Sequence, residues 1–230
     1  ASGEVRWEYD PQINRENTRP FRCRGVSYWS APENAKLERC RQRIYSLTAD
    51  RRLIALDAHT GKLCTGFGKN GEVALAEYGR FKPDEVASSS PPAVANGVVV
   101  VGSSIIDFAL AEAPRGVVAA FDAITGEPLW QFDPLEGIAH TGGGNVWAPI
   151  AIDAIRDLVF LPTSAPSPDY YGVLRPGNNQ NANSVIALQL STGKQVWSFQ
   201  HSHHDLWDFD TPAQPILFDW PSEKGAIPAL

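Results

Sequence analysis

The stretch that decides the fold occurs three times: Leu53–Phe67 reads LIALDAHTGKLCTGF, Val118–Phe132 reads VAAFDAITGEPLWQF, and Val185–Phe199 reads VIALQLSTGKQVWSF. Each copy is an apolar strand, a polar turn that ends in Thr-Gly, and a second strand, because glycine supplies the positive φ that such turns often need. A partial copy opens the chain in ASGEVRWEYD, where we expect only the turn and the last strand. The turn glycines lie at 3, 61, 126 and 193, so the period is 58 to 67 residues.

Two further strands are expected before each turn, which makes four antiparallel strands per repeat. In the first repeat they are Gly25–Trp29 and Arg43–Thr48, in the second Pro92–Asn96 and Val98–Gly102, and in the third Trp147–Asp153 and Leu158–Thr163. We name the four strands of a repeat A to D in chain order. A four-stranded unit that recurs about every 60 residues predicts an all-β fold, a β-propeller whose blades carry loop insertions.

The repeat register divides the chain into blades of one partial propeller domain, residues 1–230. We predict the end of a blade at 1–10, blades at 22–68, 88–132 and 145–200, and the start of another blade at 208–230, with Pro215–Trp220 as its first strand. Three blades and two partial ones cannot close a ring, and the chain has no methionine, so we expect the parent protein to be longer.

A tryptophan follows the turn glycine by four residues in three of the copies, as Trp7, Trp130 and Trp197, and Thr65 takes this position in the remaining copy. An indole is large enough to fill the wedge between neighbouring blades and can still satisfy its N–H group. We therefore predict that these tryptophans pack between the sheets.

Composition excludes several classes of protein. A formal net charge of −6 argues against a nucleic-acid partner, which normally meets a basic surface. No apolar run approaches the roughly 20 residues that span a bilayer. The three cysteines allow one bridge within the chain, for which Cys23–Cys40 is one candidate, and their count neither proves an oxidising compartment nor fits a metal cluster.

Unusual polar residues gather where A-strands begin and B-strands end, which is one rim of the propeller because A and B are antiparallel. They are Arg24, Ser88 to Ser90, Ser103, Ser104, Asp107, Trp147, Thr163 to Asp169 and His201 to Asp210. The sequence thus predicts that arginine, hydroxyl, indole and carboxylate groups converge at one mouth of the central channel.

Structural interpretations stand beside the functional ones. Arg24 could form a surface ion pair, Trp147 could be another packing indole, and Asp107 could cap a loop. The segment HSHHDLWDFD (201–210) contains ligand types for zinc, but its spacing matches no closed zinc motif. If the segment is extended, Asp208 and Asp210 share a face opposite that of Asp205, and one carboxylate could serve as a base.

The same segments resemble the pyrroloquinoline-quinone (PQQ) dependent dehydrogenases, most closely the membrane-bound glucose, quinate and polyol branch. The resemblance runs through CRGVSYW (23–29), RLIALDAHTGKLC (52–64), VWAP (146–149), PTSAPSPD (162–169) and HHDLWDFD (203–210). Together with the repeats it covers essentially the whole chain. It implies an eight-bladed propeller with the cofactor at the centre of one face.

Position by position, the resemblance assigns roles to residues of the predicted rim. It implies that Arg24 contacts the quinone side of PQQ, that Ser89 and Ser104 lie near its carboxylates, that PQQ stacks on Trp147, that Asp107 is a ligand of a catalytic Ca²⁺ or Mg²⁺, and that Asp208 is the catalytic base. Where the alcohol dehydrogenases have a metal-ligating Asn, 18 residues past the stacking tryptophan, this chain has Ala165. Where some glucose enzymes have a histidine near the substrate, it has Trp29.

We therefore expect a piece of a periplasmic quinoprotein dehydrogenase that oxidises a sugar or polyol hydroxyl and passes electrons to ubiquinone. Any membrane anchor would lie outside these residues, and the piece alone should bind PQQ weakly without useful turnover. Two alternatives remain: a non-catalytic propeller scaffold that binds proteins, and a histidine-metal hydrolase at 201–208. The sequence does not decide which sugar or polyol is the substrate, or whether the cation is Ca²⁺ or Mg²⁺.

Overall fold

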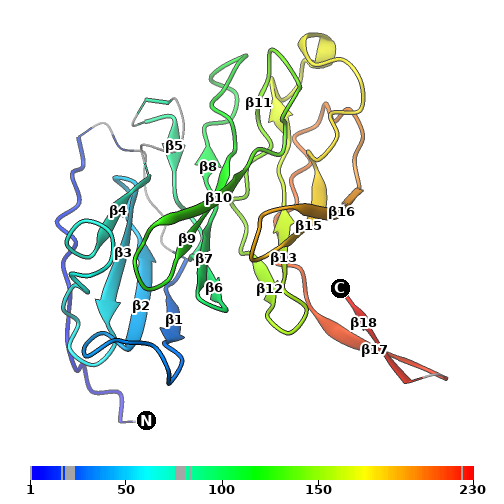
Figure 1. Ribbon diagram of the computed structural model, residues 1–230. Coiled ribbons are helices and arrows are strands. Elements are labelled where there is room, and N and C mark those ends of the chain that lie inside the picture. Colours follow the sequence, from blue (N-terminus) through cyan, green and yellow to red (C-terminus); the bar gives the residue numbers. More distant parts are fainter. Residues whose placement is uncertain (1, 17, 19–23, 76–80, 83, 224) are drawn as a thin grey trace.

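The chain folds into antiparallel sheets that stand side by side in chain order (Figure 1). The computed structural model describes residues 2–16, 18, 24–75, 81–82, 84–223 and 225–230. Three of its sheets have four strands each, with the strands in chain order across the sheet. The predicted all-β fold of four-stranded antiparallel blades is thereby confirmed, and we call these sheets blades 1, 2 and 3.

The strands lie close to the predicted positions. Blade 1 has β1 (Ser27–Ser30), β2 (Gln42–Leu47), β3 (Arg52–Asp57) and β4 (Glu72–Ala74); blade 2 has β6 (Ala93–Ala95), β7 (Val98–Val101), β9 (Val118–Asp122) and β10 (Pro128–Phe132); blade 3 has β12 (Ala151–Asp153), β13 (Leu158–Pro162), β15 (Ser184–Gln189) and β16 (Gln195–Gln200).

Two small sheets and one hairpin add to the blades. The strand β5 (Val86–Ala87) pairs with β8 (Ser104–Ile105), and β11 (Gly142–Gly143) pairs with β14 (Pro166–Ser167). A 3₁₀ turn, η2 (Gly172–Leu174), interrupts the loop between β14 and β15. Near the C-terminus β17 (Phe218–Ser222) and β18 (Gly225–Ala229) form a hairpin that projects from the stack of sheets in Figure 1.

Alternating side chains of the middle blade build two separate cores. In the valine run of β7, Val99 and Val101 pack into a buried cluster with blade 1, whereas Val98 and Val100 pack into a cluster with blade 3. Successive side chains of a strand point to opposite faces, so a strand between two sheets must be apolar at every position. All four valines are buried for this reason.

Tryptophan packs between successive units of the chain at two of the three predicted positions, each time against a glycine. Trp130 of blade 2 lies against Gly193, where a Cβ would come within 2.6 Å of the indole, and its Nε1–H donates to the Leu190 carbonyl at 2.8 Å. Trp7 lies in the same way against Gly61 and donates to the Ala58 carbonyl at 3.1 Å. Trp197, at the outer strand β16, is 38% exposed and contacts Phe160 of its own blade.

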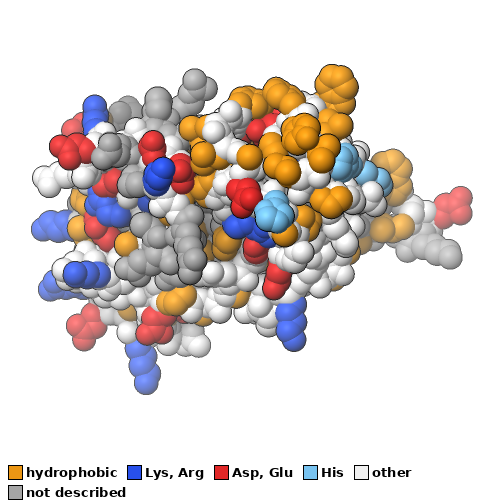
Figure 2. Space-filling view, turned by 90° about the horizontal axis from the view of Figure 1, so that it is seen from above, with side chains coloured by type: hydrophobic (Ala, Val, Ile, Leu, Met, Phe, Trp, Pro, Cys, Tyr) orange, Lys and Arg blue, Asp and Glu red, His pale blue; other side chains and the backbone are white. Residues whose placement is uncertain are grey.

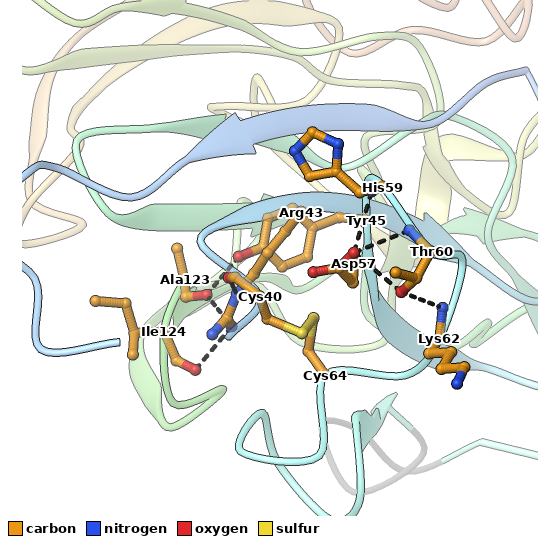
Figure 3. Close-up of a disulfide and its surroundings, with 10 residues drawn as sticks. All are labelled: Cys40, Arg43, Tyr45, Asp57, His59, Thr60, Lys62, Cys64, Ala123 and Ile124. Carbon is orange, nitrogen blue, oxygen red and sulfur yellow. Dashed lines mark hydrogen bonds between the residues drawn. A yellow bond between two sulfur atoms is a disulfide. The ribbon is translucent and has the colours of Figure 1, made fainter. Parts of the chain in front are cut away.

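The interface between blades 1 and 2 lacks this tryptophan and is built differently (Figure 3). The Ala123 carbonyl, which corresponds to those of Ala58 and Leu190 in the repeat, accepts bonds from Arg43 Nη1, at 2.8 Å, and from the Tyr45 hydroxyl. Phe67 is fully buried beside Tyr45, with ring centroids 5.6 Å apart. A charged and an aromatic side chain therefore satisfy the acceptor that an indole satisfies elsewhere.

Cys40 and Cys64 form a disulfide beside this interface, with Cα atoms 5.8 Å apart (Figure 3). The candidate pairing Cys23–Cys40 is therefore wrong, and Cys23 itself lies outside the described residues.

The predicted fourth strand of blade 1 also differs from the structure. Its chain pairs with β3 near Leu63, leaves the sheet, and returns as β4 at Glu72–Ala74. Three residues of this excursion have positive φ: Gly68, Asn70 and Gly71.

Three further boundaries differ from the prediction. Residues 2–10 form no strand, since none of the described strands pairs with them, although Trp7 occupies its expected place. The A-strand of blade 3 begins at Ala151 rather than Trp147. The predicted strand Pro215–Trp220 begins only at Phe218 and pairs with β18. In the part of the chain that the structure describes, no helix is long and apolar enough to cross a membrane.

Candidate functional site

The A-starts and B-ends of the blades meet at one rim, as predicted, at the upper side of Figure 1. The pairing of β5 with β8 places Ala87 opposite Ser104, so the serine run that follows β5 lies beside the end of the B-strand of blade 2. Ser104 is half-buried in this ladder. The long loops that follow the B-strands rise above the same rim.

Trp147 is the residue on which this rim converges. Its carbonyl accepts bonds from the hydroxyls of Ser89, at 3.1 Å, and Ser90. The Arg24 guanidinium carbon lies 5.1 Å from the centre of its ring, and its Nε1–H donates to Asp210 Oδ2 at 2.6 Å. Segments that enter blades 1 and 2, together with the segment after blade 3, thus hold one half-buried indole.

The structure therefore brings together Arg24, Ser89 and Trp147, which the sequence had placed at one rim. Arg24 makes a cation–π contact with Trp147, and it takes part in none of the ion pairs found among the described residues. Trp147 lies outside the series of indoles that pack between blades, because it precedes strand β12.

Asp208 is half-buried in the segment that follows β16. Burial, and after it the negative charges of Asp210 and Asp107, together raise the pKa of its carboxyl to about 7. Desolvation and like charges both disfavour the ionised form. Asp208 is thus a carboxyl group that exchanges its proton near neutral pH, as a general base must.

The segment that carries Asp208 is turned rather than extended. Asp208 has a φ of 59° and His204 a φ of 47°, so the simple alternation of faces expected for a strand does not hold. Asp205, which is 3% exposed, accepts backbone N–H bonds from Trp207, at 3.1 Å, and Phe209, at 2.7 Å. One buried carboxylate therefore determines the turn around Asp208.

Two buried side chains tie this turn to the body of blade 3. Asn183 Nδ2 donates to Asp205 Oδ2 at 3.1 Å and to the Phe209 carbonyl at 2.9 Å. Arg175, whose side chain is fully buried, donates to the carbonyl groups of Pro168 and Asp205. Burial lowers the pKa of Arg175, while the nearby Asp205 carboxylate raises it. Asn183 and Arg175 thus hold the loop between β14 and β15 to the segment after β16.

Asp107 lies in the loop after β8 and is exposed. The neighbouring Phe108 N–H donates to Asp169 Oδ2 at 3.0 Å, so the loops that follow the B-strands of blades 2 and 3 touch. Asp107 and Asp169 both raise the pKa of Asp208 through their negative charge, which places all three carboxylates in one neighbourhood.

Aromatic and aliphatic side chains surround these loops at the surface. Figure 2, which views the molecule from above, shows hydrophobic side chains gathered on one half of this face, with a few acidic ones among them. Phe108 and Tyr170 stack with ring centroids 5.0 Å apart. Tyr171 and Val173 are also exposed in the same loop as Tyr170.

The sequence did not single out Asp210, Asp169 or Ser90 as separate site residues. Asp210 accepts the indole N–H of Trp147 and, through Oδ1, the Ala165 backbone N–H at 2.8 Å. Its only signal in the sequence was its place two residues after Asp208. These two hydrogen bonds join residues that are 63 and 45 positions apart in the chain. Contacts between such distant residues leave no periodic pattern in the sequence.

Two of the three histidines of the segment have ordinary polar contacts. His201 Nε2 contacts the Thr211 hydroxyl, and His204 Nδ1 contacts the Gly177 carbonyl at 2.7 Å. Burial lowers the pKa of His201. No group of three or more His, Cys, Asp and Glu side chains is placed to hold a metal ion within the described ranges.

Comparison with known proteins places the chain among quinoproteins. A family model described as "PQQ: Glucose/ethanol/alcohol dehydrogenase, beta-propeller domain" matches residues 1–230. The chain is 39% identical over 247 residues to a quinoprotein glucose dehydrogenase of Escherichia coli (strain K12), covering 100% of the chain and 31% of that protein. It is 39% identical over 245 residues to a glycerol dehydrogenase large subunit of Gluconobacter oxydans (strain 621H), covering 100% of the chain and 33% of that protein.

Among solved structures, the quinohemoprotein alcohol dehydrogenase from Comamonas testosteroni matches with a TM-score of 0.76 and 28% identity. The match covers 98% of this chain and 35% of that one. The chain thus spans about a third of the length of the curated relatives it matches.

Proposed function

Because the chain belongs to the family of PQQ-dependent glucose, ethanol and alcohol dehydrogenases, we propose that it forms part of an enzyme that oxidises a sugar or polyol hydroxyl by hydride transfer to PQQ. The observation that carries the proposal is the convergence of Arg24, Ser89 and Asp210 on the indole of Trp147, beside a carboxyl group whose pKa lies near 7. Carboxyl groups with a pKa shifted this far cluster at functional sites, which favours an enzyme over a scaffold propeller.

The residues present suit a flat, anionic cofactor. Trp147 offers a half-buried aromatic face, and Arg24, an exposed cation, lies over that face. Among the described residues, two buried polar side-chain atoms have no hydrogen-bond partner: Arg51 Nε and Ser103 Oγ. Both belong to this rim, since Arg51 Nη1 donates to the Ser88 hydroxyl at 2.9 Å and Ser103 directly precedes Ser104. Unused donors at a rim are what a polyanionic ligand would engage.

The acidic neighbourhood suits a divalent cation. Four carboxylates raise the pKa of Asp208, in the order Asp210, Asp107, Asp169 and Asp205. A cation would relieve this repulsion, and Ca²⁺ or Mg²⁺ takes carboxylate oxygens as ligands. We assign Asp107 as its carboxylate ligand. With Ala165 in place of an Asn ligand, this chain would offer the cation one protein oxygen fewer than the alcohol dehydrogenases do.

When bound, PQQ would supply the acceptor for the hydride of the substrate C–H bond, and the cation would supply a Lewis acid. The chain's own groups bind and orient. Trp147 supports the flat ring, Arg24 neutralises charge on the quinone side, and Ser89 and Ser104 lie toward the carboxylates. Asp208 accepts the proton of the substrate hydroxyl, and the turn capped by Asp205 holds its carboxyl in place. We assign this reaction to the periplasm, with ubiquinone as electron acceptor and any membrane anchor outside the chain.

The test is dye-linked oxidation of glucose, quinate and polyols by the whole protein loaded with PQQ and Ca²⁺ or Mg²⁺. Asp208→Asn should abolish turnover and leave PQQ binding and folding unchanged, because the amide cannot accept the proton. Asp219→Asn, an exposed change in β17, serves as the matched control and should retain full activity. Unchanged activity of Asp208→Asn would remove Asp208 as the base, and oxidation that needs no PQQ would remove the proposed function.

The pH dependence follows from the state of Asp208. A base works when deprotonated, and the pKa of Asp208 is raised to about 7. We therefore expect kcat/KM to fall as the pH is lowered through about 7, with the midpoint at lower pH once a cation is bound.

The 230-residue chain by itself should bind PQQ weakly and show no useful turnover, since it spans only about a third of its relatives. Titrating it with PQQ in the presence of Ca²⁺ or Mg²⁺ tests this. Tight binding with rapid dye reduction would show that these three blades suffice.

A further inference from the structure

We propose that Asp210 is a positioning residue whose carboxylate holds the indole of Trp147 in one plane and so prepares the face on which a flat cofactor stacks. Each of its oxygens has a donor: Oδ2 accepts the indole N–H at 2.6 Å, and Oδ1 accepts the Ala165 backbone N–H at 2.8 Å. The inference rests on the proposed function and extends it to a residue with no role so far.

The contacts on Trp147 divide by what they restrain. Ser89 and Ser90 bond to its carbonyl and therefore fix the backbone. Arg24 lies over the ring face, but its side chain is exposed and a ligand could displace it. Of the hydrogen bonds that described residues make with Trp147, the bond to Asp210 is the one that reaches the ring itself. Rotation of the indole about its Cβ–Cγ bond would break it.

Asp210 is itself fixed at both ends. The turn just before it is capped by Asp205, through the Trp207 and Phe209 N–H groups. On its other side the bond to Ala165 anchors it to the end of the B-strand of blade 3. An acceptor that is anchored to the body of the blade can restrain a ring, whereas one on a free loop would follow it.

The residue type supports positioning rather than simple packing. Burial raises the pKa of Asp210, and the bonds from Ala165 and Trp147 oppose this rise, so an ionised side chain here is costly to desolvate. An uncharged amide would be cheaper to bury. The carboxylate forms a shorter and stronger bond to the indole N–H, which is useful only if the ring orientation matters.

The experiment measures the equilibrium dissociation constant of PQQ for the whole protein, with Ca²⁺ or Mg²⁺ present, by equilibrium dialysis. Asp210→Asn should weaken PQQ binding about tenfold, the size expected when a hydrogen bond to a charged group is weakened. At saturating PQQ its kcat should change far less, because Asp208 remains in place. Asp219→Asn is the control and should bind PQQ like the unaltered protein.

A double-mutant cycle separates positioning from a general structural effect. Trp147→Phe removes the indole N–H but keeps an aromatic face, and it should also weaken PQQ binding. If Asp210 acts through this N–H, the double variant should bind no more weakly than the weaker single variant. Additive losses, or a PQQ affinity of Asp210→Asn equal to that of the unaltered protein, would overturn the inference.

PQQ binding by the unaltered protein distinguishes failure of the proposed function from failure of this inference. Failure of that protein to bind PQQ would reject the proposed function and this inference with it, whereas binding that Asp210→Asn leaves unchanged rejects the inference alone. Should Asp210→Asn fail to fold, as judged by circular dichroism, Asp210→Glu keeps the charge and moves the oxygens. It should then weaken PQQ binding, and unaltered binding by a folded Asp210→Glu would count against positioning.

Discussion

The two interfaces between blades solve one packing problem with different chemistry. Between blades 2 and 3, the buried Trp130 fills the wedge and donates to the Leu190 carbonyl. Between blades 1 and 2, Arg43 and Tyr45 bond to the corresponding carbonyl of Ala123, and Phe67 supplies the aromatic volume. Each interface requires an aromatic group in the wedge and a hydrogen-bond donor for the turn carbonyl. Neither requirement specifies a particular residue.

The interfaces also differ in how many side chains stabilise them. A single side chain supplies both the volume and the donor at the Trp130 interface. At the Arg43 interface the guanidinium bonds to three carbonyls, those of Cys40, Ala123 and Ile124, and a disulfide lies beside it. We therefore expect the Trp130 interface to be sensitive to one substitution and the Arg43 interface to lose stability in steps.

The largest effect should come from Trp130→Ala. Removing a buried indole costs about 3–5 kcal/mol of unfolding free energy, and the Leu190 carbonyl loses its donor as well. Urea unfolding of the chain measures this. Trp207→Ala is the matched control, because Trp207 is 79% exposed and its loss should change stability by less than about 0.5 kcal/mol. Equal losses for both variants would contradict the wedge role of Trp130.

Reduction of the Cys40–Cys64 disulfide should have the next largest effect. The bridge joins residues 24 positions apart, and opening a loop of that size costs about 3 kcal/mol. Unfolding with and without dithiothreitol measures it, and a Cys40→Ala/Cys64→Ala variant should show no response to the reductant. The loss caused by Trp130→Ala should be the same in both states, since distant sites act additively. A change in that loss would show that the two interfaces are coupled.

Arg43→Met should cost about 2 kcal/mol, because buried carbonyls lose their donor while the Tyr45 hydroxyl remains for one of them. Arg39→Met, at an exposed position nearby, is the control and should leave the unfolding free energy unchanged. A neutral Arg43→Met would mean that Tyr45 and Phe67 suffice for this interface.

The smallest effect should come from Thr65→Trp, which places an indole where the repeat would have one. Thr65 is exposed, since the chain leaves the sheet near this residue, so stability should change by less than about 0.5 kcal/mol. Fluorescence of the new indole should indicate a solvated environment. A loss above 1.5 kcal/mol, the range of overpacked cores, would show that position 65 points into the wedge.

The repeat pattern predicted the parts of the fold that local chemistry determines. Apolar strands, Thr-Gly turns and the position of Trp130 all follow from a few neighbouring residues, and the predicted strand Val98–Gly102 matches β7, Val98–Val101, to within one residue. The meeting of Arg24, Ser89 and Trp147 followed from topology alone, because antiparallel strands bring A-starts to B-ends.

The remainder depends on contacts that local patterns do not contain. The return of blade 1 as β4 depends on a loop with three positive φ values. The Cys40–Cys64 pairing joins residues 24 positions apart in the chain. The part played by Asp210 depends on where a turn capped by Asp205 directs it, and the sequence alone offered three carboxylates without a way to rank them.

The contacts of Trp147 have a consequence for the order of events during synthesis. Its partners Ser89 and Asp210 lie 58 and 63 residues away along the chain, in opposite directions. Contacts between distant segments form late, because the loop between them must first close. A chain leaving the ribosome could complete its first two sheets early, yet the indole would stay free to rotate until residue 210 had emerged. Ligand added before that moment would find a surface without a defined shape.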